Sequence, residues 1–232
     1  GYRYYDKKEM AVRYPFGHGL SYTTFEYSDI KLSDTAVGDD DILTVNAVIT
    51  NTGNCVGKEI VQLYVADKSG FAVRPEKELK DFIKIELQPG ESKTVTFRLD
   101  KRAFSYYNEE LGDWYAPNGK YDIMIASSSR DIRLTAEVTH KTAVKLPFVA
   151  TENTVFGEFM DYAEGKATID LLFSKVAKGL LGGDHFEPEA VRSMIGSMPL
   201  RQIRSFGGIS DELLQQAVDM LNKDFGGFKA QM

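Results

Sequence analysis

The sequence has few of the residues that usually build compact metal or redox sites. It contains one cysteine, Cys55, and three histidines, His18, His140 and His185, which lie far apart along the chain. A single thiol cannot form an internal disulfide, and none of these residues has the spacing of metal ligands. We therefore predict no metal site and no cofactor.

Long apolar runs and clusters of basic residues are also missing. No stretch approaches the ~20 apolar residues of a membrane span, and the sequence does not open with a basic segment followed by an apolar one. The 28 Lys and Arg residues are scattered among 34 Asp and Glu residues, which gives a net charge of -6. The sequence therefore predicts neither a nucleic-acid partner nor a membrane partner.

The composition that is present is typical of a globular protein. Of the 232 residues, 43% are hydrophobic and 27% are charged, and at roughly 150 residues per domain this length favours two unequal modules. The sequence opens with Gly1 in a tyrosine-rich phrase, so we expect further residues upstream in the natural protein. Residues 1–24 show no regular period and hold too little apolar surface for a core of their own. Their aromatic side chains need a partner, either the next module or another domain.

Residues 25–140 show the pattern of an antiparallel β-sandwich. Short β-branched and aromatic runs are separated by turn signals about every ten residues. No convincing helical period occurs there, which disfavours crossover helices and a parallel sheet. Gln88-Pro89-Gly90-Glu91 is a typical tight turn. The predicted strands are 25–32, 42–50, 59–66, 79–87, 93–99, 104–107, 113–115, 120–126 and 132–138.

The second part of the chain has helical periodicity. Residues 141–150 are predicted to be a linker, and residues 151–232 a small all-α region. The clearest helix begins after Ser210, a good N-cap, and ends at Gly226. The other predicted helices span 154–164, 167–181, 188–198 and 199–206. The apolar stripe of Ile169, Leu172, Phe173 and Val176 fits either a core within one chain or a homodimer interface.

No residue is assigned a catalytic role, and the substrate-binding residues are unknown. Gly17-His18-Gly19 lacks the helix and glycine pattern of a phosphate cradle, so a tight turn is the better interpretation. Asp39-Asp40-Asp41 supplies oxygens that calcium prefers, but no ligand-spaced partners accompany it, which favours a solvated loop.

One further segment has the residue types of a sugar site. Glu109, Glu110 and Asp113 lie near Trp114 and Tyr115. A retaining glycosidase needs two carboxyl groups about 5 to 5.5 Å apart, which neighbouring residues of a strand and its loop rarely provide. We favour structural packing of Trp114 over a catalytic role.

Several ordered phrases resemble one enzyme family. Residues 14–25, YPFGHGLSYTTF, resemble the end of the second catalytic-region domain of family 3 glycoside hydrolases of the β-glucosidase and β-xylosidase type, and residues 1–6 resemble the approach to it. The fibronectin type III-like domain that follows in this family resembles NTGNCVGKEIVQLYV, RPEKELKDFIKIEL, QPGE and WYAPNGKYDIMIASSSRDIRL. The helices beyond Pro147 resemble a C-terminal extension of some bacterial members.

The resemblance implies a non-catalytic role for this chain. In the family, an upstream barrel supplies the aspartate nucleophile and a following α/β domain usually supplies the acid/base, and neither residue maps onto a position here. The parent enzyme would release terminal β-linked sugars from oligosaccharides or glycosides. We expect the chain to be inactive alone and to support the upstream catalytic domains, its main partners.

Two alternative hypotheses about the role of the chain also fit the sequence. The β module could instead be a carbohydrate-binding or interaction module that uses exposed aromatic residues such as Trp114, Tyr115 and Phe71. The helices could mediate assembly. The single thiol and the lack of any Asn-x-Ser/Thr acceptor fit a bacterial cytoplasmic location, and a secreted protein is the alternative because we expect further residues upstream.

Overall fold

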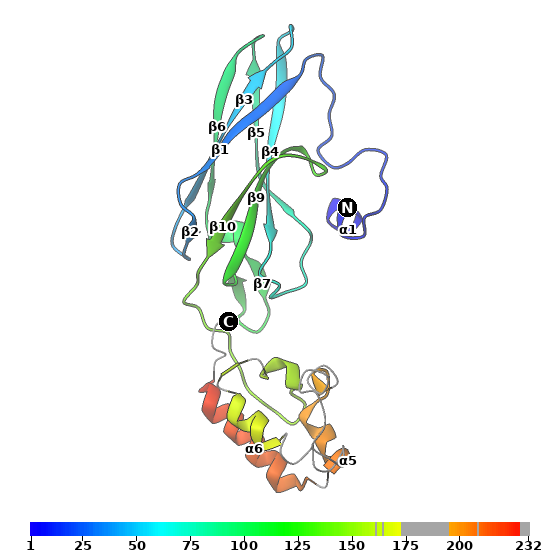
Figure 1. Ribbon diagram of the computed structural model, residues 1–232, viewed down its shortest axis with the longest axis vertical. Helices are drawn as coiled ribbons and strands as arrows, with labels where there is room; N and C mark the ends of the chain where they lie inside the picture. Colours follow the sequence, from blue (N-terminus) through cyan, green and yellow to red (C-terminus); the bar gives the residue numbers. More distant parts are fainter. Residues whose placement is uncertain (161, 164, 173–194, 208, 228–232) are drawn as a thin grey trace. The chain divides into compact units, whose positions relative to one another are not determined.

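The computed structural model describes the chain except for residues 161, 164, 173–194, 208 and 228–232 (Figure 1). It divides into two compact units, Gly1–Ala143 and Val144–Met232. More of the chain is strand than helix, so the predicted mainly β character is confirmed. In the part of the chain that the structure describes, no helix is long and apolar enough to cross a membrane.

The first unit contains two main sheets and a small hairpin. The three-stranded sheet has the order β1-β3-β6, and the five-stranded sheet has the order β2-β10-β9-β4-β5. The hairpin pairs β7 with β8. The strands are β1 (Phe25–Leu32), β2 (Ala36–Val37), β3 (Leu43–Asn51), β4 (Gly57–Asp67), β5 (Glu78–Leu87), β6 (Ser92–Leu99), β7 (Tyr106–Asn108), β8 (Asp113–Tyr115), β9 (Gly119–Ser128) and β10 (Asp131–His140).

One strand pair departs from the predicted antiparallel arrangement. Ala36 and Val37 of β2 pair in parallel with Thr139 and His140 of β10. The sequence did not reveal β2 because two residues are too few to show an alternating pattern. All other strand pairs in the named sheets are antiparallel.

Both main sheets contribute to one apolar core. In β3, the alternate residues Leu43, Val45, Ala47 and Ile49 are fully buried, as their period of two predicts. They share a cluster with residues of β4, β6 and β9. Full burial of one such Leu, Ile or Val side chain stabilises the fold by about 1.5–3 kcal/mol. This core fixes which strand residues point outward, and it thereby defines the outer face of each sheet.

Two short helices of this unit were not predicted. The first, α1 (Tyr2–Lys7), precedes the strands, and the second, α2 (Lys101–Phe104), follows β6. Asp100 caps α2 by accepting the backbone N–H of Arg102 at 2.9 Å. Both helices are too short to show a helical period in the sequence. The residue range 104–107 was predicted as a strand, but its strand begins at Tyr106 because Phe104 closes α2.

The second unit is built from short helical segments. They are η1 (Phe156–Glu158), η2 (Leu200–Gln202), α5 (Ile203–Gly207) and α6 (Asp211–Phe225), and residues 166–172 are also helical. The Ser210 hydroxyl accepts the Leu213 N–H, and α6 ends at Gly226 with a φ of 56°, as predicted. In the described part of the range 154–164, which was predicted as a helix, the helical residues are those of the 3-10 turn η1. Most of the range 173–198 lies outside the described residues.

The apolar side chains of the second unit pack on one another. Phe148 and Ala150 belong to this core, so the predicted linker over 141–150 ends earlier than expected. Ile169 and Leu172 are buried in the same core, where they are not available to a second subunit. Phe173 and Val176, the other members of the predicted stripe, lie outside the described residues.

Candidate docking surface

Strand β4 is buried on both of its faces over part of its length. Val61 and Leu63 point into the core of the first unit. Gln62 and Tyr64 alternate with them and point outward, yet they are only 2% and 0% exposed. The nearly continuous apolar run of residues 59–66 is typical of a strand that is covered on both faces. The outward residues are covered by the segment that precedes β1, which runs back along β4 and β5 to α1 (Figure 1).

Gln62 anchors this covering segment. Its Nε2 donates to the carbonyl oxygens of Gly17 at 3.1 Å and Ser127 at 2.7 Å. The Tyr64 hydroxyl donates to Gln62 Oε1 at 2.6 Å. A buried amide costs free energy unless it is bonded in this way. Gly17 has a φ of 78°, and a Cβ atom there would lie 2.2 Å from Gln62 Oε1, so the close approach requires glycine.

Aromatic contacts hold the other end of the segment. The Tyr2 ring stacks on Phe16 at a centroid distance of 4.6 Å and meets Tyr64 edge-on at 6.1 Å. The Tyr2 hydroxyl accepts the Leu79 N–H at 2.8 Å, and the Phe16 carbonyl accepts the Ser129 N–H at 2.8 Å. The aromatic residues that needed a partner surface thus find part of it on the sheet of the same unit.

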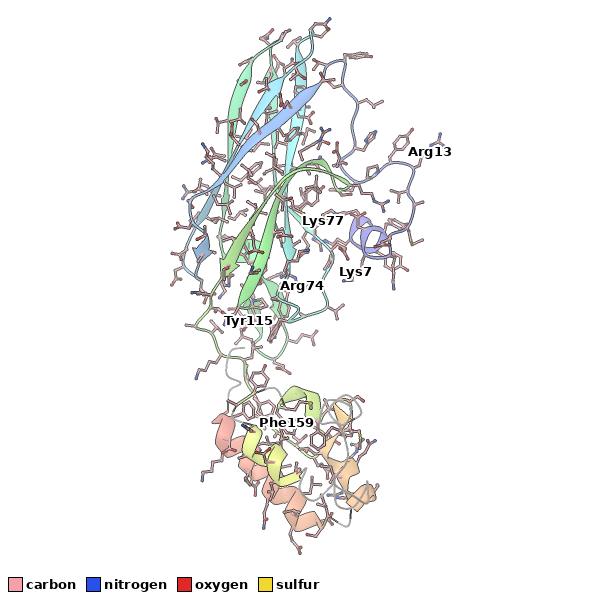
Figure 2. All side chains as sticks on the ribbon, viewed as in Figure 1. Lys7, Arg13, Arg74, Lys77, Tyr115 and Phe159 are labelled. Carbon is pink, nitrogen blue, oxygen red and sulfur yellow. The ribbon has the colours of Figure 1, made fainter. Side chains whose placement is uncertain are left out.

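Ion pairs reinforce the attachment of α1. Asp6 binds Arg130 at 2.8 Å and Lys77 at 3.4 Å, and its side chain is only 7% exposed. Arg3 pairs with Glu78 at 3.0 Å. Figure 2 shows Lys77 near α1, whereas Arg13 projects away from the sheets on the outer bend of the segment. Pairs with one buried partner are costly to break, because they leave a desolvated charge behind.

A neighbouring part of the same surface carries exposed apolar side chains. Phe82 lies directly opposite Gln62 on β5 and is 60% exposed, and Ile60 is 42% exposed. Leu20 and Tyr22, in the connection to β1, are 93% and 100% exposed. We call Leu20, Tyr22, Val56, Ile60 and Phe82 the uncovered strip; all except Phe82 line a groove of about 790 Å³. Exposed apolar side chains that gather around one groove are typical of an interaction site.

The groove also contains carboxyl groups, and each has its own partners. Glu59 accepts the Tyr27 hydroxyl at 2.5 Å. Burial raises the pKa of Glu59, and the hydrogen bond from Tyr27 and the charge of Arg133 only partly oppose this. Asp131 accepts the Ser127 hydroxyl at 2.6 Å and pairs with Arg133 at 2.7 Å, contacts that lower its pKa against the effect of burial. Glu59 and Asp131 are held by these separate partners and not by a hydrogen bond to each other. The groove therefore gives no support to a catalytic pair of a general acid and a nucleophile.

The structure places the first group of sequence candidates in turns and loops. His18 is exposed, stacks on Tyr14 at 5.5 Å and donates its backbone N–H to Pro15 in a turn. Asp39 contacts Lys101 at 3.3 Å and accepts the Thr142 hydroxyl, and Asp41 accepts the Gly38 N–H. Among the described residues, no three His, Cys, Asp or Glu side chains gather in a way that could hold a metal ion.

The second group of candidates does not form an exposed aromatic surface. Tyr115 is only 3% exposed and packs against Phe71 at 5.7 Å. Trp114 is partly buried, with the Arg102 guanidinium 3.5 Å from its ring centroid. The expectation that Tyr115 is available to a sugar is therefore wrong, because it faces inward at the end of β8. Glu109, Glu110 and Asp113 are exposed on the hairpin.

Two buried polar centres were missed by the sequence analysis. The His140 ring is fully buried beside Phe104, with Nε2 3.9 Å from Asp39, and burial lowers its pKa. Arg74 donates to Asp67 at 3.1 Å, Glu78 at 2.8 Å and two backbone carbonyls of residues 104 and 105. The alternation of β10 through Val138 pointed to an inward His140, but no local signal distinguishes Arg74 from an ordinary loop arginine.

Comparisons with known proteins agree with this architecture. Residues 59–129 match the model of the fibronectin type III-like domain. The chain is 43% identical over 224 residues to thermostable β-glucosidase B of Acetivibrio thermocellus, which covers 96% of the chain and 30% of that enzyme. It is also 44% identical over 135 residues to the β-glucosidase BoGH3A of Bacteroides ovatus, over 58% of the chain and 18% of that enzyme.

The comparison with solved structures also finds β-glucosidases. The GH3 β-glucosidase of Bifidobacterium adolescentis matches 69% of the chain with 42% identity and a TM-score of 0.62, and the match covers 23% of that enzyme. β-Glucosidase 3B of Thermotoga neapolitana matches 60% of the chain with 41% identity and a TM-score of 0.55, over 19% of its own length. The chain thus spans less than a third of these relatives. It belongs to the family 3 glycoside hydrolases of the β-glucosidase type, and it corresponds to the part that carries their fibronectin type III-like domain.

Proposed function

We propose that this chain is the non-catalytic part of an enzyme that removes terminal β-linked sugars from oligosaccharides or glycosides, and that it supports the catalytic domains. The uncovered strip is the observation that carries the proposal. A unit with a complete core leaves Leu20 and Tyr22 almost fully exposed beside Ile60. Exposed apolar surface of this extent is stabilised when another protein surface covers it. The catalytic domains of the same protein are the partner that fits the family.

The proposed support role rests on a rigid platform. The two main sheets supply one shared core, which is the arrangement expected of a fibronectin type III-like sandwich, and the second unit would be a small all-α body. Gln62 and the Asp6 ion pairs fix the covering segment on the sheet. The strip that continues from this segment would then meet its partner in one defined orientation. We place such an enzyme in a bacterial cytoplasm.

Activity measurements test the absence of catalysis in the chain. The chain alone should not hydrolyse an aryl β-glucoside, whereas the same chain joined to the catalytic part of the Acetivibrio thermocellus relative should do so. Saturable hydrolysis by the chain alone would overturn the proposal. No activity in the joined protein, although it is folded and soluble, would count equally against a supporting role.

Variants of the uncovered strip test the docking surface. In the joined protein, Leu20→Ser with Tyr22→Ser should lower the temperature of inactivation by several degrees, because the apolar contact with the catalytic part is lost. Val149→Ser removes an exposed apolar side chain, 74% exposed, from the second unit and serves as the control. Equal inactivation temperatures for the strip variant and the unchanged protein would show that the strip is not the docking surface.

A further inference from the structure

A second groove of the first unit has a different character from the uncovered strip. It has a volume of about 600 Å³ and lies between the segment 72–81, the end of β6 with α2, and the β7–β8 hairpin. Known small-molecule sites fall in the range of about 300–1,000 Å³. Its lining includes the aromatic side chains of Tyr106, Tyr107 and Trp114. The uncovered strip contributes none of the lining residues, so the two surfaces are separate.

The charge of this groove is opposite to that of the protein. The chain carries a net charge of -6, yet five basic side chains line the groove against three acidic ones. Each acidic side chain already has an ion-pair or hydrogen-bond partner, although Asp81 and Asp100 accept only backbone N–H groups and keep their negative charge. Glu78 binds Arg3, Arg74 and Lys80, which together keep its pKa low despite burial. Asp100 caps α2, and Asp81 accepts the Phe82 N–H at 2.7 Å.

Two arginines remain available to a ligand. Among the described residues, Arg98 and Arg102 have no carboxylate within salt-bridge distance in the structure, and both side chains are exposed. Arg102 stacks on the Trp114 ring at 3.5 Å, which restrains the guanidinium plane and leaves its N–H edge free to donate. A guanidinium held in this way matches the two oxygens of a carboxylate and loses little side-chain entropy on binding.

The floor of the groove is rigid. Arg74 is only 9% exposed and joins Asp67 and Glu78 to the carbonyl oxygens of Phe104 and Ser105. These bonds connect the segment after β4 with the end of α2, so they fix the distance between two walls of the groove. The Tyr107 ring meets Trp114 edge-on at 5.7 Å and is 52% exposed. Its free surface suits the apolar C–H face of a sugar ring, since aromatic faces carry partial negative charge.

We propose that this groove binds a saccharide that carries a carboxylate, such as a uronic acid residue. Arg98 and Arg102 bind the carboxylate, and Tyr107 packs against the sugar ring. The inference goes beyond the supporting role proposed above and does not depend on catalysis. It also replaces the predicted aromatic surface that included Tyr115, which is buried.

Binding to the whole chain tests this proposal. D-Glucuronate and tri-galacturonate are titrated against the chain at pH 7 and low salt by NMR or calorimetry, with glucose, cellotriose and sulfate as controls. We expect the uronates to bind at least tenfold more tightly than any control, with affinity that falls as salt is added. Equal binding of cellotriose would overturn the role of the carboxylate, and equal binding of sulfate would overturn the role of the sugar.

Variants locate the site. Arg98→Gln with Arg102→Gln should weaken uronate binding at least tenfold, and Tyr107→Ala should weaken it severalfold while keeping the charges. Lys7→Gln with Arg13→Gln removes the same two charges from exposed positions outside the groove and should leave affinity within twofold. Thermal unfolding of each variant checks that it is folded. Unchanged affinity in the folded double variant would overturn the proposal, and it would leave the activity tests of the joined enzyme unaffected.

Discussion

The outward surface around β4 contains two neighbouring regions that differ in how deeply their side chains are buried. In one, Gln62 and Tyr64 are buried under the segment that precedes β1. In the other, Ile60 on the same strand and Phe82 on the next are exposed. The polar Gln62 is buried and the apolar Ile60 is exposed, the reverse of the usual preference. The difference shows that burial here is decided by where a distant segment docks, not by the residues of the strand.

The two regions also differ in how they are stabilised. The covered region depends on specific polar contacts, since an unbonded buried amide or charge costs more than a bonded one contributes. The uncovered strip depends on no polar contact and would gain stability only by losing contact with water. Substitutions should therefore destabilise the isolated chain in the first region and have almost no effect on it in the second.

The largest effect is expected at Arg74, which holds the chain segment to which α1 attaches. Arg74→Met leaves the Asp67 and Glu78 carboxylates without their buried partner, and we expect a loss of about 3–5 kcal/mol in the free energy of unfolding. Arg13→Met, at an exposed position, should change it by less than about 0.5 kcal/mol. Urea denaturation measures both. Similar small losses would show that the Arg74 contacts contribute little.

A smaller effect is expected where the segment approaches β4 most closely. Gly17→Ala places a Cβ against Gln62 and also requires a positive φ, and the strain should cost about 1–3 kcal/mol. Gly90→Ala is the matched control, because Gly90 has a φ of 75° but open space around it. The Gly17 variant should lose more stability than the control and should be cleaved faster by protease before β1. Equal losses of stability in the Gly17 and Gly90 variants would show that the positive φ causes the loss and that the contact with Gln62 adds nothing.

The pH dependence of stability tests the role of Glu59, which precedes Ile60 at the border between the two regions. Its pKa is raised above the ordinary 4.5 by burial, so the folded chain keeps a proton that the unfolded chain has released. The free energy of unfolding should therefore fall as pH rises from about 4.5 through the raised pKa. Glu59→Gln still accepts the Tyr27 hydroxyl without this cost.

The Glu59 variant should become more stable relative to the unchanged protein as pH rises over that window, as measured by thermal unfolding between pH 4 and pH 8. Glu86→Gln removes an exposed carboxyl from the same groove and separates the effect from the change in net charge. A difference in stability between the Glu59 variant and the unchanged protein that stays constant from pH 4 to pH 8 would contradict the raised pKa of Glu59.

The smallest effect is expected in the uncovered strip. Leu20→Ser and Tyr22→Ser should each change the free energy of unfolding of the isolated chain by less than about 0.5 kcal/mol. Both side chains contact mainly water in this chain, so no packing is lost. A loss above about 1 kcal/mol in urea denaturation would show that these side chains are already covered, and it would remove the contrast on which the docking proposal depends.

Much of the strand arrangement could be predicted from local patterns. Alternation at period two identified β3, and Pro89-Gly90 marked the turn between β5 and β6. Features of two to six residues, such as β2 and α1, escaped because they are shorter than the periods that reveal them. In the second unit, the caps at Ser210 and Gly226 predicted α6 well, whereas η1 stayed short where a longer helix was expected.

The surfaces could be predicted only in part. The aromatic residues of the first segment indicated that it needs a partner, and the apolar run of β4 indicated that a face is covered. No local pattern shows that Gln62 and Gly17, 45 residues apart, meet. Arg74 and Arg102 likewise acquire their roles from residues far away in the sequence. Long-range contacts of this kind determine where the grooves and the covered region lie. Short sequence motifs were therefore enough to indicate the family, but they did not predict these surfaces.

The single cysteine offers a direct way to observe what happens at the groove. Cys55 is exposed in the connection between β3 and β4, immediately before Val56 of the uncovered strip. Because no other thiol competes for the reagent, a maleimide fluorophore would attach at this position alone. Its emission would change when a second protein surface excludes water from the dye, so association of the chain with a separate catalytic part, as proposed above, could be followed in real time from one natural residue.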